Sequence, residues 1–345
     1  MRDTILIAPD KFKGTFSAEE VEDIIAEELS AITPMRVIKI PMADGGEGTP
    51  HILNGSPVIV SHDFIGPQCY PGVGILDRSS FALGEAIIKT MKSSTRFYVG
   101  IGGTATVDGG AGTLQALGAR FYDKKGQLIT DPVTPRHLLE ISRVDTDAVK
   151  GILTEQATLL CDVRASLIDS SLSSLDFARQ KGATDEDIPL IAKALSKLSE
   201  KLCLDKTTSF EGAGGGLPFS LGGVMGAKAV SGAETILSSK EIDWDRIALV
   251  ITGEGSYDHQ TQGGKVAATL CREAMERDIR AVVVAGYADE ESLSADKSKP
   301  CVIRCISEKG MFDSQKAELR LRAAIRKHLL QLIGNLSRFI GNFPE

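Results

Sequence analysis

Acidic side chains set among glycines recur along this 345-residue chain, at points where short apolar runs end. Segment 96–118 shows the pattern most fully, because apolar residues 97–101 lead into a loop of glycines and threonines around Asp108. Glycines let a backbone approach a ligand closely, and the N–H groups at the start of a following helix attract anions. The loop therefore predicts a phosphate-binding site, although a single loop of this kind is equally consistent with glycines that only form tight turns. Its candidate contacts are Gly102, Gly103, Thr104, Gly109 and Gly110.

Similar loops at 44–48, 211–217 and 253–264 strengthen this prediction and add Gly214 and Gly215 to the candidates. Phosphoryl transfer needs charge neutralisation, a metal and a group that orients the attacking hydroxyl. The cations in or just after these loops are Lys13 and Lys265, and for Lys265 a solvated lysine in a first helical turn is an equally good interpretation. The candidate acids are Asp10, Asp44, Glu47, Asp108, Asp162, Glu254 and Asp258. Mg²⁺ usually takes only one or two carboxylates, and a lone Asp in a loop more often closes a turn or caps a helix.

The elements that must position these residues alternate between strand and helix near both chain ends. Strands are expected at 4–8, 37–41, 248–252, 280–285 and 301–306, with helices from Ser17, from about Gly264 and over 314–332. Alternating strands and helices favour a parallel sheet. We therefore expect a doubly wound α/β domain from 1–55 plus 245–345, with a second α/β domain, 56–244, inserted. Ligands of such sheets lie beyond the carboxyl ends of the strands, which predicts a cleft facing the inserted domain.

The composition limits the function classes. A net charge of −7 gives no basic footprint, which argues against a nucleic-acid partner. The N-terminal segment lacks the apolar core of a signal peptide, and no apolar run is long enough to span a membrane. Six cysteines without a CxxC pair read as reduced thiols, so we expect a cytoplasmic protein. Homo-oligomerisation stays open.

One motif favours a different function, the binding of a dinucleotide. Gly100, Gly102 and Ala105 fit a relaxed GxGxxA dinucleotide fingerprint, and Asp123 follows at nearly the expected distance. This would predict an NAD-dependent dehydrogenase, but Asp108 and the later glycines are no part of that fingerprint. No Walker A, HRD or DFG signature is present, so a kinase of this sequence would belong to neither the P-loop class nor the protein-kinase class.

Together the segments resemble the glycerate kinase family of bacterial glycerate catabolism, collinearly from near residue 5 to about residue 286. The matching pieces are APDKFKGTFSAEEV (8–21), PMADGGEGT (41–49), GIGGTATVDGGAGTLQALGARF (100–121), CDV (161–163), QKGAT (180–184), EGAGGGL (211–217) and ITGEGSYDHQTQGGKV (251–266). The resemblance implies a flavodoxin-like domain interrupted by a second α/β domain. It also implies ATP-dependent phosphorylation of D-glycerate with Mg²⁺, with 2-phosphoglycerate favoured over 3-phosphoglycerate as the product.

The loops and the resemblance together assign roles to individual residues. Asp44 and Asp162 are the expected metal-side acids, Lys13 is the substrate- or phosphate-binding cation, and either Asp44 or Asp108 accepts or orients the hydroxyl proton. The chain departs from the family pattern at Val107, Ala165, Ser166, Ala178, Arg179 and Ser256, and it is shorter over about 74–95. These departures keep a second interpretation open, a catalytically weakened relative that senses a small hydroxy acid or a nucleotide.

Overall fold

The computed structural model describes residues 2–168, 172–204, 209–257, 265–289, 301–305 and 316–339. They form two compact units, one from residues 1–43 and 240–345 and the other from residues 44–239. The first division thus falls at 43/44 instead of the expected 55/56, and the second at 239/240 instead of 244/245. The first shift arises because residues 44–55 bond within the second unit: Gly102 N donates to Gly45 O at 3.0 Å, and Ile52–Leu53 pair with the strand that follows them.

The first unit is built on a five-stranded sheet in which every pairing is parallel. Its strands are β1 (Thr4–Ile7), β2 (Arg36–Lys39), β10 (Ile247–Tyr257), β11 (Arg280–Ala288) and β12 (Cys301–Arg304). The spatial order is β12-β11-β10-β1-β2. Counted along the chain this is the flavodoxin-like order 2-1-3-4-5, in which the strand order reverses between β1 and β10.

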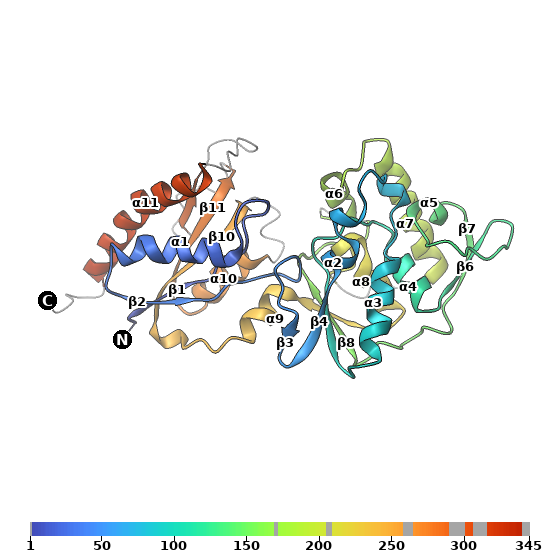
Figure 1. Cartoon of the computed structure of the whole chain (residues 1–345), viewed down its shortest axis with the longest axis horizontal. Helices are drawn as coiled ribbons and strands as arrows, with labels where there is room; N and C mark the ends of the chain where they lie inside the picture. Colours follow the sequence, from blue (N-terminus) through green and yellow to red (C-terminus); the bar gives the residue numbers. More distant parts are fainter. Residues whose placement is uncertain are drawn as a thin grey trace. The chain divides into compact units, whose positions relative to one another are not determined.

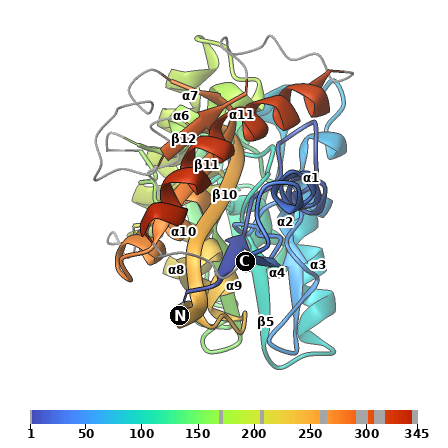
Figure 2. The same ribbon diagram turned by 90° about the vertical axis from the view of Figure 1, so that its left-hand side faces the viewer.

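Helices cover both faces of this sheet (Figures 1 and 2). They are α1 (Ala18–Ser30), α10 (Val266–Met275) and α11 (Ala317–Phe339). Alternate strand residues such as Ile5 and Val284 pack with α1 and α11, whereas Val283 packs with α10 on the other face, as the period of two in a strand requires. The helix expected from Ser17 begins with a capping box, since Glu20 N donates to Ser17 Oγ at 3.2 Å and Ser17 N donates to Glu20 Oε2 at 2.7 Å.

The second unit has its own five-stranded sheet in the order β3-β4-β5-β8-β9 and a separate two-stranded sheet of β6 and β7. The strands are β3 (Ile52–Leu53), β4 (Ser56–Val60), β5 (Phe97–Gly100), β6 (Arg120–Asp123), β7 (Ile141–Asp145), β8 (Ala157–Cys161) and β9 (Lys228–Ser231). The helices are α2 (Ser61–Ile65), α3 (Phe81–Met91), α4 (Ala111–Leu117), α5 (Pro135–Leu138), α6 (Ser174–Ala178), α7 (Asp187–Leu202), α8 (Leu217–Gly223) and α9 (Gly232–Ser238). Strands β4, β5, β8 and β9 run parallel, so their carboxyl ends meet at one edge.

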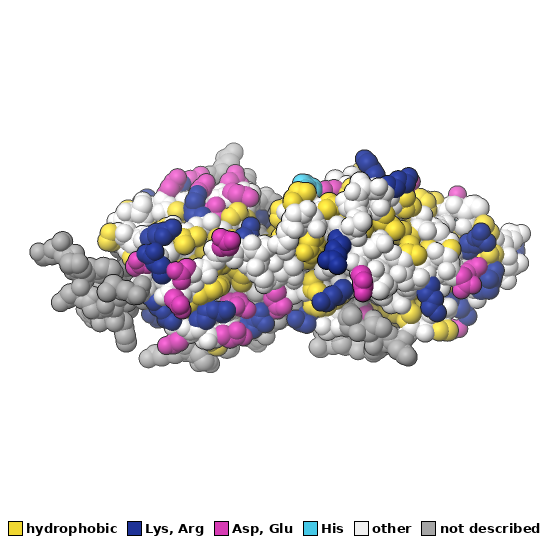
Figure 3. All heavy atoms as spheres, turned by 90° about the horizontal axis from the view of Figure 1, so that it is seen from below, with side chains coloured by type: hydrophobic (Ala, Val, Ile, Leu, Met, Phe, Trp, Pro, Cys, Tyr) yellow, Lys and Arg dark blue, Asp and Glu magenta, His cyan; other side chains and the backbone are white. Residues whose placement is uncertain are grey.

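No helix among the described residues is long and apolar enough to cross a membrane. On the face drawn in Figure 3, Lys and Arg side chains are interspersed with Asp and Glu, in keeping with the modest net charge of −7.

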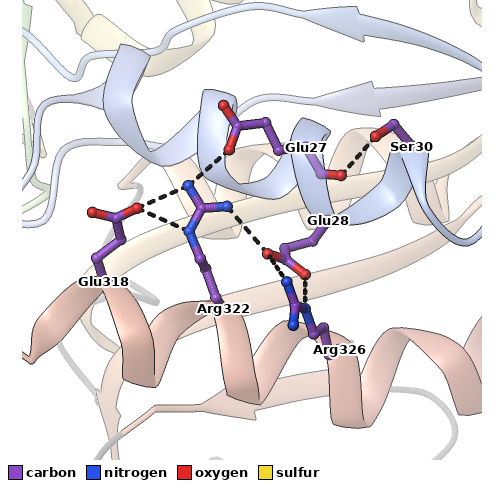
Figure 4. A network of polar contacts seen from close by, with 6 residues as sticks. All are labelled: Glu27, Glu28, Ser30, Glu318, Arg322 and Arg326. Atoms are coloured by element: carbon purple, nitrogen blue, oxygen red, sulfur yellow. Dashed lines mark hydrogen bonds and ion pairs between the residues drawn. The ribbon is translucent and has the colours of Figure 1, made fainter.

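A buried carboxylate fixes α11 against α1 (Figure 4). Glu28 is 3% exposed and accepts hydrogen bonds from both Arg326 and Arg322, the latter at 3.1 Å. The hydrogen bond from Arg326 lowers the pKa of the Glu28 carboxyl, burial opposes this, and the bond from Arg322 adds to the lowering. The ionised Glu28 carboxylate therefore stabilises the fold at pH values above its pKa in the unfolded chain. This stabilisation is lost as the pH falls through its lower pKa in the native chain.

We expect Glu28→Gln to lower the free energy of unfolding at pH 7 by about 1–3 kcal/mol, because two guanidinium groups lose a charged acceptor. Urea unfolding measures this. The matched control is Glu27→Gln, since exposed Glu27 also pairs with Arg322, and its loss should be only about 0.2–1 kcal/mol. Equal losses in the two variants, or a Glu28→Gln deficit that persists at acid pH, would contradict this account.

The pKa of Glu22, on the same helix, is shifted in the opposite direction to that of Glu28. Its side chain is 6% exposed, and burial raises the pKa of its carboxyl to about 7. Lys39, with Nζ 3.9 Å from Oε1, opposes the rise, whereas the neighbouring Asp23 and Glu19 add to it. Since the native chain holds this proton at a higher pH than the unfolded chain does, ionisation of Glu22 destabilises the fold.

We therefore expect wild-type stability to fall between pH 5 and 7 by up to about 1.4 kcal/mol for each pH unit on account of Glu22. Glu22→Gln should remove this part of the pH dependence, so that the variant gains on the wild type as the pH rises. Unfolding midpoints of both proteins at pH 5, 6, 7 and 8 provide the measurement, and parallel curves would refute the assignment.

Candidate functional site

The segment Asp44–Gly46 lies across the carboxyl ends of β5 and β8. A Cβ atom built on Gly45 would lie 2.2 Å from Leu160 O, and one built on Gly232, at the start of α9, would lie 2.0 Å from Asp44 O. Both distances are far below any real carbon contact, so only glycine admits this approach. The backbone of the segment is thus fixed against three elements of the second unit.

This approach brings together the two acids predicted to hold a metal. Asp44 is 8% exposed, and its Oδ1 accepts a hydrogen bond from Gly46 N at 3.1 Å. A Cβ atom on Gly102 would lie 2.7 Å from Gly46 Cα and 3.2 Å from Asp162 Cβ, so Asp162, Gly102 and Gly46 are immediate neighbours. The described residues contain no cluster of three or more metal-binding side chains. Asp44 and Asp162 thus lie near the same Gly46–Gly102 contact, and proteins commonly hold Mg²⁺ with one or two carboxylates beside water and phosphate oxygens.

Asp108 was expected beside a bound phosphate, but its carboxylate is buried among groups of the protein itself. It is fully buried, and its carboxylate accepts hydrogen bonds from Ser80 N at 2.7 Å, Ser80 Oγ at 2.8 Å, and the N–H groups of Gly110 and Gly112 at 3.1 Å. Burial raises the pKa of the Asp108 carboxyl, and these hydrogen bonds oppose the rise. Asp108 therefore joins the start of α4 to the start of α3.

The predicted phosphate loop must be revised for the same reason. Gly110 and Gly112 already donate to Asp108, and Gly109 N donates to Gly215 O at 3.0 Å. The anion at the start of α4 is thus a carboxylate of the chain itself. We reassign Gly109 and Gly110 to the shaping of this turn, where their φ angles of +65° and +78° favour glycine.

The first half of the loop meets a cation that the sequence analysis did not single out. Lys181 Nζ donates to Thr104 Oγ1 at 2.9 Å and to Thr106 O at 2.8 Å. A Cβ atom on Gly215 would lie 3.0 Å from the same Nζ, so the 211–217 loop borders this contact. Gly103 O contacts His62 Nδ1 at 3.0 Å. The one signal for Lys181 was its place in the matching segment 180–184.

The first unit carries a second group of candidates, at the point where the strand order reverses. Asp10 N donates to Gly253 O at 2.8 Å, and Asp10 Oδ1 accepts from Lys11 N at 2.8 Å. Glu254, 6% exposed, lies within β10 opposite Ala285, so the strand continues through a segment expected to be a loop. It does so because β11 supplies pairing partners as far as Ala288.

The remaining candidates of the first unit differ in their surroundings. Lys13 is exposed. Lys265 is the N-cap residue of α10, and its carbonyl accepts from Thr269 N at 3.0 Å. Glu47, in the second unit, is exposed, and Asp258 lies outside the described residues.

The structure contradicts the dinucleotide-binding interpretation of Gly100, Gly102 and Ala105. In such a site the glycine loop opens directly into a helix, but α4 begins only at Ala111, six residues after Ala105. Two of the departures from the family pattern, Val107 and Ala165, belong to the hydrophobic core of the second unit, with 0% and 3% exposure. Ser256 lies in β10 opposite Tyr287.

The comparisons with known proteins agree with one another. A sequence profile of the glycerate kinase family matches residues 5–71 and 73–327. A glycerate kinase of Bacillus subtilis is 30% identical over 332 residues, which cover 84% of this chain and 86% of the relative. A glycerate 2-kinase of Escherichia coli is 30% identical, covering 83% and 86%. Among solved structures, a putative glycerate kinase 2 from Salmonella typhimurium has a TM-score of 0.71 and 27% identity, covering 98% of this chain and 100% of that one.

If Asp108 holds the loop together, Asp108→Asn should lower the free energy of unfolding by about 1–3 kcal/mol, because an amide NH₂ then faces N–H donors. Asp176→Asn is the matched control: Asp176 also accepts from a serine N–H and hydroxyl, those of Ser173, but it is exposed. Its loss should be clearly smaller. Urea unfolding of both variants tests this, and an Asp108→Asn protein as stable as the control would contradict the positioning role.

Proposed function

Because this chain belongs to the glycerate kinase family, we propose that it transfers the γ-phosphoryl group of ATP to a hydroxyl of D-glycerate. The observation that carries the proposal is the neighbourhood of Asp44 and Asp162 around the Gly46–Gly102 contact. Phosphoryl transfer proceeds through a loose transition state, so catalysis depends on positioning and on charge neutralisation more than on covalent chemistry. Two carboxylates on a rigid glycine backbone suit that demand.

The donor set of the proposed site fits Mg²⁺. Asp44 and Asp162 offer hard oxygen ligands at one sheet edge, and Mg²⁺ bound there would neutralise charge on the transferring phosphoryl group. Asp44 keeps its orientation through the hydrogen bond from Gly46 N. The closely packed backbone of Gly45 restrains the segment further, as a positioned catalytic group requires.

The attacking hydroxyl needs a group that orients it. Of the two acids considered for this, Asp108 is fully buried and engaged by four hydrogen bonds, so we assign the role to Asp44. We propose the C2 hydroxyl as the acceptor, which would make 2-phosphoglycerate the product. The name of the Escherichia coli relative, a glycerate 2-kinase, supports this choice.

The candidates of the first unit complete the proposal. We propose that Lys13, exposed in the loop after β1, binds a negatively charged group of a substrate, and that Asp10, Glu254 and Lys265 line the same strand ends. The switch point between β1 and β10 is where open α/β sheets bind their ligands. A cytoplasmic location fits the free cysteines of the chain, which include Cys69, Cys161, Cys203, Cys271 and Cys305.

The test is release of ADP by the purified protein with ATP, MgCl₂ and D-glycerate. We expect turnover in the wild type and a loss of about 100-fold or more in kcat for Asp44→Asn and Asp162→Asn, because each removes charge from a metal site worth several kcal/mol. Asp123→Asn is the control, since Asp123 only closes a turn by accepting from Lys125 N and Gln127 N. Phosphorus NMR of the product distinguishes 2-phosphoglycerate from 3-phosphoglycerate.

Two results would contradict the proposed function. Wild-type protein that binds D-glycerate or ATP in calorimetry without releasing ADP would overturn the kinase proposal in favour of a sensor. Turnover that is unchanged in both Asp44→Asn and Asp162→Asn would refute the assigned metal site.

A further inference from the structure

Lys181 is tied to the loop after β5 by both its side chain and its backbone. Its ammonium donates to Thr104 Oγ1 and Thr106 O, at 2.9 and 2.8 Å. Arg78 Nη1 donates to Lys181 O at 2.8 Å and to Ala105 O at 3.2 Å. The lysine ends a short 3₁₀ turn, Arg179–Lys181, and the residue is partly exposed.

The glycine loop 211–217 is shaped around this ammonium. A Cβ atom on Gly215 would lie 2.0 Å from Thr106 O and 3.0 Å from Lys181 Nζ. Its φ of +78° disfavours other residues as well. The Thr106 hydroxyl is fully buried and has no hydrogen-bond partner among the described residues. The loop thus brings backbone, in place of side chains, against the cation.

The cation and the acid pair lie at two ends of one short stretch. Gly102 contacts Gly46 and Asp162, whereas Thr104, two residues further on, holds Lys181. Two residues span at most roughly 7 Å of backbone. Carboxylates that could hold a metal and an ammonium are therefore carried around one stretch of loop, in which the Cα atoms of Gly102 and Thr104 lie no further apart than this. This is the distribution of charge that phosphoryl transfer uses.

We propose that Lys181, together with the Thr104 hydroxyl, binds an oxyanion of one of the two substrates. The shared chemistry is a negatively charged oxygen, on either the carboxylate of the hydroxy acid or a phosphate of the nucleotide. The proposal rests on the proposed function and adds a substrate-binding residue to it. The alternative is that Lys181 only ties the loops together.

The experiment compares Lys181→Met, Lys181→Arg and the control Lys197→Met in the full-length protein. Lys197 is also partly buried in the second unit and also donates to a backbone carbonyl, that of Leu139, but lies outside the glycine loops. Steady-state kinetics are recorded with each substrate varied in turn. Calorimetry measures the binding of D-glycerate and, separately, of a non-hydrolysable ATP analogue with Mg²⁺.

We expect Lys181→Met to raise one KM and the matching Kd at least 10-fold, Lys181→Arg to restore part of the loss, and Lys197→Met to stay within 2-fold of the wild type. An effect on D-glycerate alone identifies the carboxylate as the ligand, and an effect on the nucleotide alone identifies the phosphate. Thr104→Val, which leaves the ammonium its bond to Thr106 O, should weaken the same ligand and serves if Lys181→Met does not fold.

Unchanged KM and Kd values for both substrates in Lys181→Met and Thr104→Val, even with a lower melting temperature, would overturn the proposal and leave a structural tie. The calorimetric measurements also distinguish failure of the Lys181 proposal from failure of the proposed function. A wild type without turnover that binds an anionic substrate through Lys181 would refute the reaction but retain the site.

Discussion

The backbone of the second unit approaches itself at Gly45 more closely than any residue with a side chain allows. A Cβ atom on Gly100 would lie 2.4 Å from Gly45 O, and one on Gly45 would lie 2.2 Å from Leu160 O. Dense packing of this kind resists even small changes in volume. The position of Asp44 beside Asp162, and with it the whole candidate metal site, depends on these contacts between glycines and strand ends.

Burial divides the acids of the chain into distinct roles. Asp108 and Glu28 are deeply buried, and each is held by several hydrogen bonds, so both organise the fold. Burial raises the pKa of Glu22, which Lys39 at 3.9 Å only partly opposes. Asp162, by contrast, is only partly buried and stands at a sheet edge. Carboxylates that look alike in the sequence thus differ in burial and in the hydrogen bonds that hold them.

The sequence predicts what local patterns determine. Alternation of strands and helices and the capping box at Ser17 are short-range signals, and the structure contains both. Long-range contacts decide the rest. Three such contacts cannot be read from a local sequence pattern. Strand β11 pairs with β10 through Glu254, and a serine 28 residues away holds Asp108. Lys181 contacts a threonine 77 residues away. The place of Asp108 could not be predicted from its own segment, because Ser80, which holds its carboxylate, lies elsewhere in the sequence.

The pairing of β1 with β10 has a consequence for biosynthesis. Thr252 Oγ1 donates to Ala8 O, two groups 244 residues apart in the chain, and β1 lies between β2 and β10 in its sheet. As the chain leaves the ribosome, β1 and β2 emerge before the second unit and lack β10, the central strand of their sheet, until that unit has been translated. The second unit, which is continuous in sequence, can fold during that interval. Until β10 is made, β1 therefore has an unpaired edge, and unpaired strand edges promote aggregation.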